Sequence, residues 1–181
     1  FIANIKGVQT HATVRRGLEI LVNLDHRGAV GADPLLGDGA GLLIQIPDAL
    51  FRDWATSASV NLPPVGDYAV VMCFLPQSES ARDFGVANLE SFVVKEGQTV
   101  LGWRDVPHDN ASLSKHPDIV ATEPYHRQII IGRGDSIANE DDFERKLYII
   151  RKVCSSKIYS AYAGEPTDFY NALAGMPFFR G

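Results

Sequence analysis

Residues 68–75 read YAVVMCFL, and all eight belong to the hydrophobic residue types. An unbroken apolar run of this length, rich in valine, is typical of a β-strand that is buried on both faces. We therefore place this strand in the core of the domain and expect the neighbouring elements to pack around it.

Downstream of this strand, the apolar spacing alternates between helical and extended patterns. It predicts a helix over 78–95, a strand over 98–106, a long polar loop over 108–122 and a strand over 125–131. The last element has the clearest pattern, because Asn139 is a good N-cap and acidic residues load the first turn after it. Its apolar stripe at helical spacing consists of Phe143, Leu147, Ile150 and Cys154.

Upstream, the pattern predicts a strand over 1–6, a helix after Thr10, a strand over 42–46 and a short helix from Ala49 to Trp54. Helices and strands thus interleave along the chain. Periodicity alone supports an α/β or a layered α+β domain around a buried sheet and does not choose between them.

Composition excludes several classes of function. The chain has 181 residues, of which 45% are hydrophobic and 22% charged, and its net charge is −5. These values fit a soluble globular domain without a nucleic-acid surface, and no apolar run is long enough to span a membrane or form a signal peptide. We expect a cytoplasmic protein, or a plastid protein if the source is a plant. Cys73 and Cys154 lack metal or redox spacing and are expected to be small buried hydrophobic residues.

The stretch from Asp25 to Gly41, DHRGAVGADPLLGDGAG, combines one arginine with glycine-flanked turns. Arg27 offers a planar fork of donors that matches a carboxylate, although a surface ion pair is an equally reasonable role. His26 is expected to interact with free carbonyls at a helix end. The GDGAG segment lacks the lysine of a P-loop and leads toward a predicted strand, so a nucleotide site is the weaker interpretation of this turn.

The histidines, at positions 11, 26, 108, 116 and 126, show no ligand spacing among themselves or with a nearby cysteine or carboxylate. The linear sequence therefore predicts no metal site. It also shows no nucleophile motif, since neither cysteine has a neighbouring base.

Five separated blocks resemble, in the right order, the N-terminal class II glutamine amidotransferase domain of glutamate synthase large subunits. The blocks are FIANIKG from residue 1, LDHRGAVGADPLLGDGAG from 24, LGWRDVPHDN from 101, EPYHRQIII from 123 and FERKLYIIRK from 143. The resemblance assigns residues 1–181 to part of this domain. The blocks cover roughly residues 1–170, and the tail over 171–181 matches no part of the family pattern.

The resemblance implies an α+β fold of the N-terminal-nucleophile hydrolase type, with four layers in the order α-β-β-α, here in part. It implies that Arg27 binds the α-carboxylate of glutamine. The residues expected to organise the loop around it are His26, Gly28, Gly37, Asp38, Gly39 and Gly41.

The family starts with a Cys-Gly-Val-Gly segment directly before the residue that Phe1 matches, so the resemblance implies that the nucleophilic cysteine precedes Phe1. The family's oxyanion element and the acid that binds the substrate amine have no match before Gly181. The 181 residues by themselves are therefore expected to lack glutaminase activity.

For the parent enzyme, the resemblance implies glutamine hydrolysis to glutamate and ammonia, and transfer of the ammonia to 2-oxoglutarate to form a second glutamate. It implies no cofactor in this chain, with FMN and an iron–sulfur cluster elsewhere in the parent. The expected partners are glutamine, the synthase domain of the same polypeptide and, as an open alternative, a small electron-donating subunit; nucleic acid and membrane are not expected. A non-catalytic, ligand-binding or regulatory domain of the same ancestry is the alternative function.

Overall fold

The computed structural model describes residues 2–24, 41–111, 120–121, 123–161 and 178–180. The chain divides into two compact units, Phe1–Gln45 and Ile46–Gly181. The second unit holds the sheet and the buried core of the described residues, and the described part of the first unit contains the helix α1 (His11–Asn23).

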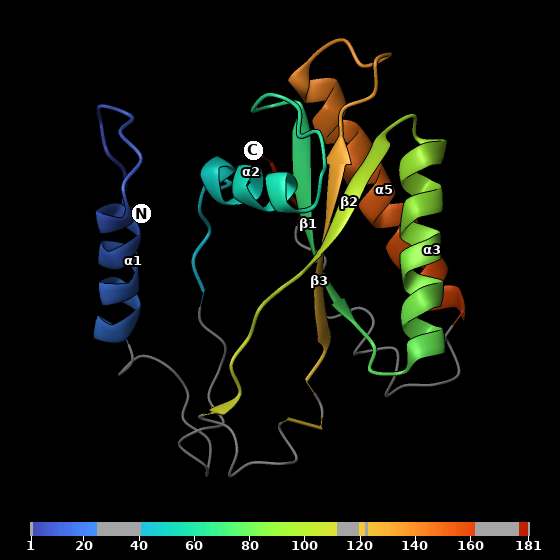
Figure 1. The fold of residues 1–181 in the computed structure, drawn as a ribbon, viewed down its shortest axis with the longest axis horizontal. Coiled ribbons are helices and arrows are strands. Elements are labelled where there is room, and N and C mark those ends of the chain that lie inside the picture. Colours follow the sequence, from blue (N-terminus) through green and yellow to red (C-terminus); the bar gives the residue numbers. More distant parts are fainter. Residues whose placement is uncertain (1, 25–40, 112–119, 122, 162–177, 181) are drawn as a thin grey trace. The chain divides into compact units, whose positions relative to one another are not determined.

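The sheet of the second unit has four strands in the order β2-β3-β1-β4. Figure 1 labels β1, β2 and β3. Their bounds are Tyr68–Leu75 for β1, Thr99–Asp105 for β2, Tyr125–Gly132 for β3 and Phe178–Arg180 for β4. All neighbours pair in antiparallel fashion. The strands predicted over 68–75, 98–106 and 125–131 are thereby confirmed, and three residues of the unplaced tail pair with β1.

The helices that the structure describes in full in this unit pack around the sheet. They are α2 (Asp48–Ser57), α3 (Glu79–Lys95) and α5 (Glu140–Ala161). Because β1 and β2 both run antiparallel to β3, they run parallel to each other, and the β1–α3–β2 segment is a βαβ unit with β3 inserted between its strands. The interleaved order of elements is therefore compatible with an antiparallel sheet, and the fold is α+β.

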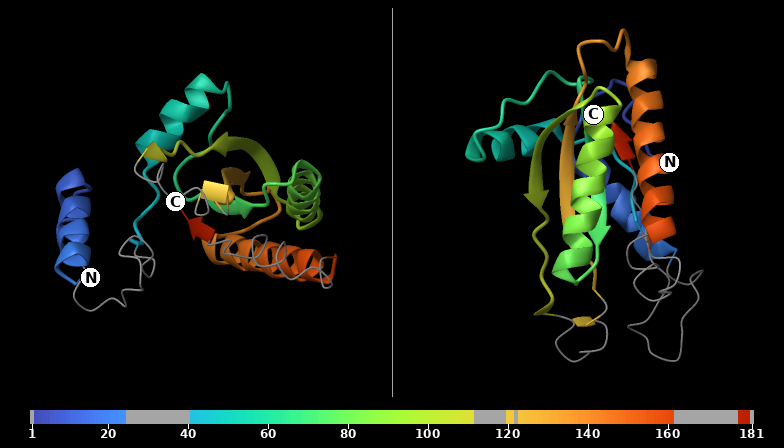
Figure 2. Two further views of the ribbon diagram at one scale, coloured as in Figure 1. Left: turned by 90° about the horizontal axis from the view of Figure 1, so that it is seen from below. Right: turned by 90° about the vertical axis from the view of Figure 1, so that its right-hand side faces the viewer.

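The two faces of the sheet are covered by different helices, as the views in Figure 2 show. Alternate residues of β1, from Ala69 to Leu75, pack with α3 and α5 in the main core cluster. The intervening positions Tyr68 and Val70 pack with Phe51 of α2 in a second cluster. Since successive side chains of a strand point to opposite faces, this division explains the unbroken apolar run of β1.

Helix α5 begins as predicted. The backbone N–H of Asp142 donates to Oδ1 of Asn139 at 2.9 Å, so the asparagine side chain caps the first turn. The predicted stripe is confirmed as the buried face of the helix: Phe143, Leu147, Ile150 and Cys154 are at most 2% exposed. The helices predicted over 78–95 and from Ala49 to Trp54 are present as α3 and α2.

In the first unit, α1 spans His11–Asn23 with Thr10 at its N-cap, as predicted. The two strands predicted in this region, over 1–6 and 42–46, are wrong, because residues 2–6 and 41–46 form no strand. Leu43 is 81% exposed and Ile44 is 47% exposed. An extended apolar segment becomes a strand only where another strand accepts its hydrogen bonds, and none of the described strands pairs with these segments.

The described residues contain a single sheet, so the four-layer arrangement implied by the resemblance stays a prediction. Among the helices that the structure describes, none has the length and apolar character needed to cross a membrane.

Candidate functional site

Most of the residues assigned to the glutamine site by the resemblance lie outside the described residues. These are His26, Arg27, Gly28, Gly37, Asp38 and Gly39. Gly41 is described and exposed, and a Cβ built on it would meet no atom of the described residues within 4 Å. The roles assigned to all seven residues stay predictions.

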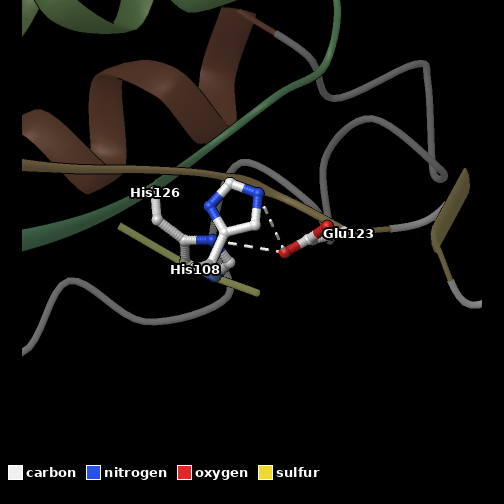
Figure 3. Close-up of side chains that lie close together, drawn as sticks. All are labelled: His108, Glu123 and His126. Atoms are coloured by element: carbon white, nitrogen blue, oxygen red, sulfur yellow. Dashed lines mark ion pairs between the residues drawn. The ribbon is translucent and has the colours of Figure 1, made fainter. Parts of the chain in front are cut away.

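At one end of the β2–β3 pair, the structure brings together two histidines and a carboxylate that the linear spacing did not group. His108 follows β2, Glu123 precedes β3, and His126 is the second residue of β3 (Figure 3). Oε1 of Glu123 lies 3.8 Å from Nε2 of His108 and 3.8 Å from Nδ1 of His126. One ligand-type atom from each residue lies within 4.8 Å of the other two.

Antiparallel pairing causes this convergence. Asp105 is registered with Arg127, and the N–H of Val106 donates to the backbone oxygen of His126 at 3.2 Å, which extends the β2–β3 ladder by one step. His108 and His126 are 18 positions apart in the sequence, so a search for ligand spacing misses them. The signal that could have found them is their position at the facing ends of two predicted neighbouring strands.

Glu123 is held from two sides. The side-chain amide of Gln77 donates to its backbone oxygen, and the side-chain amide of Asn110 donates to its Oε2. These contacts leave Oε1 as the carboxylate oxygen that faces the two imidazoles. The Glu123 side chain is 20% exposed, so it lies mostly within the protein at this end of the sheet.

The two histidines have different surroundings. The His108 side chain is 54% exposed, and its Nδ1 lies 3.4 Å from the backbone oxygen of Val106. The His126 side chain is 22% exposed and meets the Phe74 ring edge-on, with 5.3 Å between ring centroids. Nδ1 of His126 is inaccessible to solvent, and no described residue forms a hydrogen bond with it.

The strand ends beneath this cluster are fixed by polar contacts. Nε of Arg127 lies 2.9 Å from a carboxylate oxygen of Asp105, and its guanidinium lies over the Trp103 ring at 4.8 Å from the centroid. The indole N–H of Trp103 donates to Glu90 at 2.7 Å. These contacts join β3 to β2 and β2 to α3 just below the histidines.

Both cysteines of the chain are free and fully buried, as predicted. Burial raises the pKa of the Cys73 thiol to about 12 and the pKa of the Cys154 thiol to about 11. A nucleophilic cysteine needs an accessible thiolate, which requires a lowered pKa. Neither thiol meets this requirement.

The chain belongs to the class-II glutamine amidotransferases, because it matches this family over residues 1–174. The resemblance recognised from the five sequence blocks is thereby confirmed.

Within this family, the chain is similar to glutamate synthases. It is 44% identical over 151 residues to the glutamate synthase [NADPH] large chain of Bacillus subtilis, a match that covers 83% of this chain and 10% of the relative. It is 37% identical over 181 residues to the chloroplastic ferredoxin-dependent glutamate synthase of rice, a match that covers 100% of this chain and 11% of the relative. It is 36% identical to ferredoxin-dependent glutamate synthase 2 of Synechocystis, a match that covers 87% of this chain and 10% of the relative. The chain thus spans about a tenth of the length of these relatives.

Proposed function

We propose that this chain is the glutamine-binding part of a glutamate synthase. In the complete enzyme, the amidotransferase domain hydrolyses glutamine to glutamate and ammonia, and the ammonia is transferred to 2-oxoglutarate to form a second glutamate. The observation that carries this proposal is the family match over residues 1–174 combined with relatives that are themselves glutamate synthases.

Arg27 is the proposed ligand of the α-carboxylate of glutamine. Its guanidinium presents two parallel N–H donors, which match the two oxygens of a carboxylate. It lies within the block LDHRGAVGADPLLGDGAG, the longest of the five blocks that resemble the family. The turn residues of the same block are proposed to hold the arginine in position.

The proposed reaction needs a thiol that this chain's own cysteines do not supply. Cys73 and Cys154 are buried and their pKa values are raised, so a thiolate at either position is disfavoured. We infer that the amino-terminal cysteine of the family, preceding the residue matched by Phe1, attacks the side-chain amide. Its sulfur bonds to the amide carbon, its α-amine carries the proton to the leaving nitrogen, and water then releases glutamate from the thioester.

The remaining features of the parent follow from the same proposal. The described sheet with α3 and α5 on one face is proposed to be part of a four-layer α-β-β-α arrangement. FMN and an iron–sulfur cluster are proposed for other regions of the parent, together with a synthase domain and, in one alternative, a small electron-donating subunit. The proposed location is the cytoplasm, or the plastid for a plant source, in line with chloroplastic plant relatives.

Replacement of Arg27 by lysine in the complete enzyme tests this assignment. Lysine keeps the charge and loses the planar fork, and a hydrogen bond to a charged group contributes about 1.5–3 kcal/mol. We expect kcat/KM for glutamine to fall roughly ten- to two-hundredfold, at about 1.4 kcal/mol per factor of ten. Glutamate formation from ammonium salt bypasses the glutamine site and should stay unchanged.

The matched control is Arg16→Lys, on the exposed surface of α1, which should alter neither activity. A parallel fall of the glutamine-dependent and ammonia-dependent activities in Arg27→Lys would show that this arginine supports the fold and does not bind glutamine.

A further inference from the structure

We propose that His108, Glu123 and His126 form a binding site for a divalent transition-metal ion, of which Zn²⁺ is the representative. The inference is independent of the proposed amidotransferase activity. It rests on the convergence of the three side chains, on the absence of hydrogen bonds between them, and on the groups that hold them in place.

The distances fit an ion better than a direct ion pair. A charged N–H donor hydrogen-bonded to a carboxylate lies about 2.7–2.9 Å from the oxygen. Both imidazole nitrogens instead lie 3.8 Å from Oε1 of Glu123. Ligands about 2.0–2.2 Å from a tetrahedral Zn²⁺ lie about 3.3 Å from one another, so the present separations leave room for an ion between them.

Only a small adjustment closes the site. The three ligand atoms lie within 4.8 Å of one another, so the largest closing movement is about 1.5 Å against the tetrahedral spacing of about 3.3 Å. His108 can supply this movement by side-chain rotation, because it is half-exposed and follows the end of β2. His126 and Glu123 are the more buried members and define the fixed side of the site.

The surroundings supply the outer contacts that metal-binding side chains need. Nδ1 of His108 faces the backbone oxygen of Val106, which can only accept a hydrogen bond, so the proton belongs on Nδ1 and the lone pair on Nε2 faces Glu123. Asn110 orients the carboxylate through Oε2 and leaves Oε1 free to bind. Nδ1 of His126 is shielded from solvent and has no hydrogen-bond partner among the described residues, so an ion would satisfy it.

The donor set indicates the class of ion. Two neutral imidazoles and one carboxylate suit Zn²⁺ and other late first-row divalent ions, whereas Ca²⁺ and Mg²⁺ prefer oxygen ligands alone. The bound ion would link the segment that follows β2 to the start of β3, and solvent would complete its coordination on the exposed His108 side. We therefore assign it a structural role at this end of the sheet.

The test measures Zn²⁺ binding by the chelator-treated full-length protein that carries this chain, in competition with a chromogenic chelator. The wild type should bind one more equivalent of Zn²⁺ than His108→Ala or His126→Ala, or should bind that equivalent at least tenfold more tightly. Asn110→Ala should weaken the same equivalent roughly ten- to hundredfold, as the loss of an outer partner does. His11→Ala, which alters an exposed histidine on α1, is the control and should bind as the wild type does.

Glu123→Gln keeps the shape of the side chain and removes its charge, so this variant should also fail to bind the additional equivalent of Zn²⁺. It keeps the test decisive if a histidine variant fails to fold. Co²⁺ offered as a probe should give ligand-field absorption bands in the wild type and in His11→Ala that the ligand variants lack. Equal Zn²⁺ binding by the wild type and by every correctly folded ligand variant would overturn the proposal, and so would a wild type that binds no equivalent at this site.

Discussion

Removal of one oxygen atom from the buried Tyr68 tests how the second face of the sheet is held to α2. Tyr68 is 0% exposed, and its hydroxyl donates to Oδ1 of Asp48 at 2.8 Å. The other carboxylate oxygen accepts from Nε of Arg52 at 2.8 Å, and Arg52 also donates to the backbone oxygen of Pro63. Tyr68→Phe keeps the ring in the apolar cluster and deletes only the hydroxyl.

The cost of this variant follows from the kind of hydrogen bond that is lost. A hydrogen bond to a charged group contributes about 1.5–3 kcal/mol, and we expect the lower end, because the Asp48 side chain is 29% exposed and water can replace the lost donor. Equilibrium urea unfolding followed by circular dichroism at pH 7 should show a decrease of about 1.5 kcal/mol in the free energy of unfolding. Tyr148→Phe, on the exposed side of α5, is the matched control and should stay within about 0.5 kcal/mol of the wild type.

The pH dependence gives the same variant a second readout. Burial alone would raise the pKa of Asp48, but the hydrogen bonds from Arg52 and Tyr68 outweigh it and hold this pKa below its usual value. A lowered carboxyl pKa contributes stability that is present above the ordinary pKa and is lost as the pH falls through the folded-state pKa. The difference between wild type and Tyr68→Phe should therefore be largest near neutral pH and should shrink in acid.

On the alkaline side, burial and the Asp48 carboxylate raise the pKa of Tyr68. The wild type therefore loses the contribution of Tyr68 to stability as the pH rises above the ordinary tyrosine pKa of about 10, and the phenylalanine variant has no such contribution to lose. An equal loss of stability in Tyr68→Phe and Tyr148→Phe at pH 7 would refute the reasoning. So would a difference from wild type that is as large in acid as at neutral pH.

The sequence predicted best those elements whose local signals agreed with their packing. The run over 68–75 is buried on both faces because helices cover both sides of β1. In α5, Asn139 caps the first turn of the helix, and the helical spacing places the apolar stripe on the face that packs into the core. In each case, the residues that form the element also make its principal contacts.

The predicted strands over 1–6 and 42–46 failed because strand formation depends on a partner. Leu43 and Ile44 have the apolar character of a strand, but apolar character does not determine whether another strand lies alongside. The same limit applies to sheet direction. The order of elements did not show that β3 is inserted between β1 and β2, which makes the described sheet antiparallel.

The cluster of His108, Glu123 and His126 was missed for a related reason. A helical metal motif brings ligands together through a fixed spacing, whereas this cluster depends on the register between two strands. Once Asp105 is paired with Arg127, the residues just beyond them must lie near each other. The prediction that Arg27 binds glutamine needs no pairing of strands, since it rests on the chemistry of the guanidinium and on the family resemblance; Arg27 lies outside the described residues, so it stays a prediction.

Two further predictions concern α5 and the buried thiols. Asn139→Ala removes the acceptor for the N–H of Asp142, and urea unfolding should show a loss of about 1 kcal/mol; no measurable loss would contradict the cap. Cys73 and Cys154 should react with a thiol reagent at pH 8 far more slowly in the folded protein than in denaturant, where both should react rapidly. The reason is that burial both blocks access and raises their pKa values to about 12 and about 11, so the folded state holds almost no thiolate. Reaction of these thiols then requires opening of the core. Phe143→Ala destabilises the core cluster that contains both cysteines, so this variant should react faster at both thiols. An unchanged rate in Phe143→Ala would show that the reagent reaches the thiols without opening of the core.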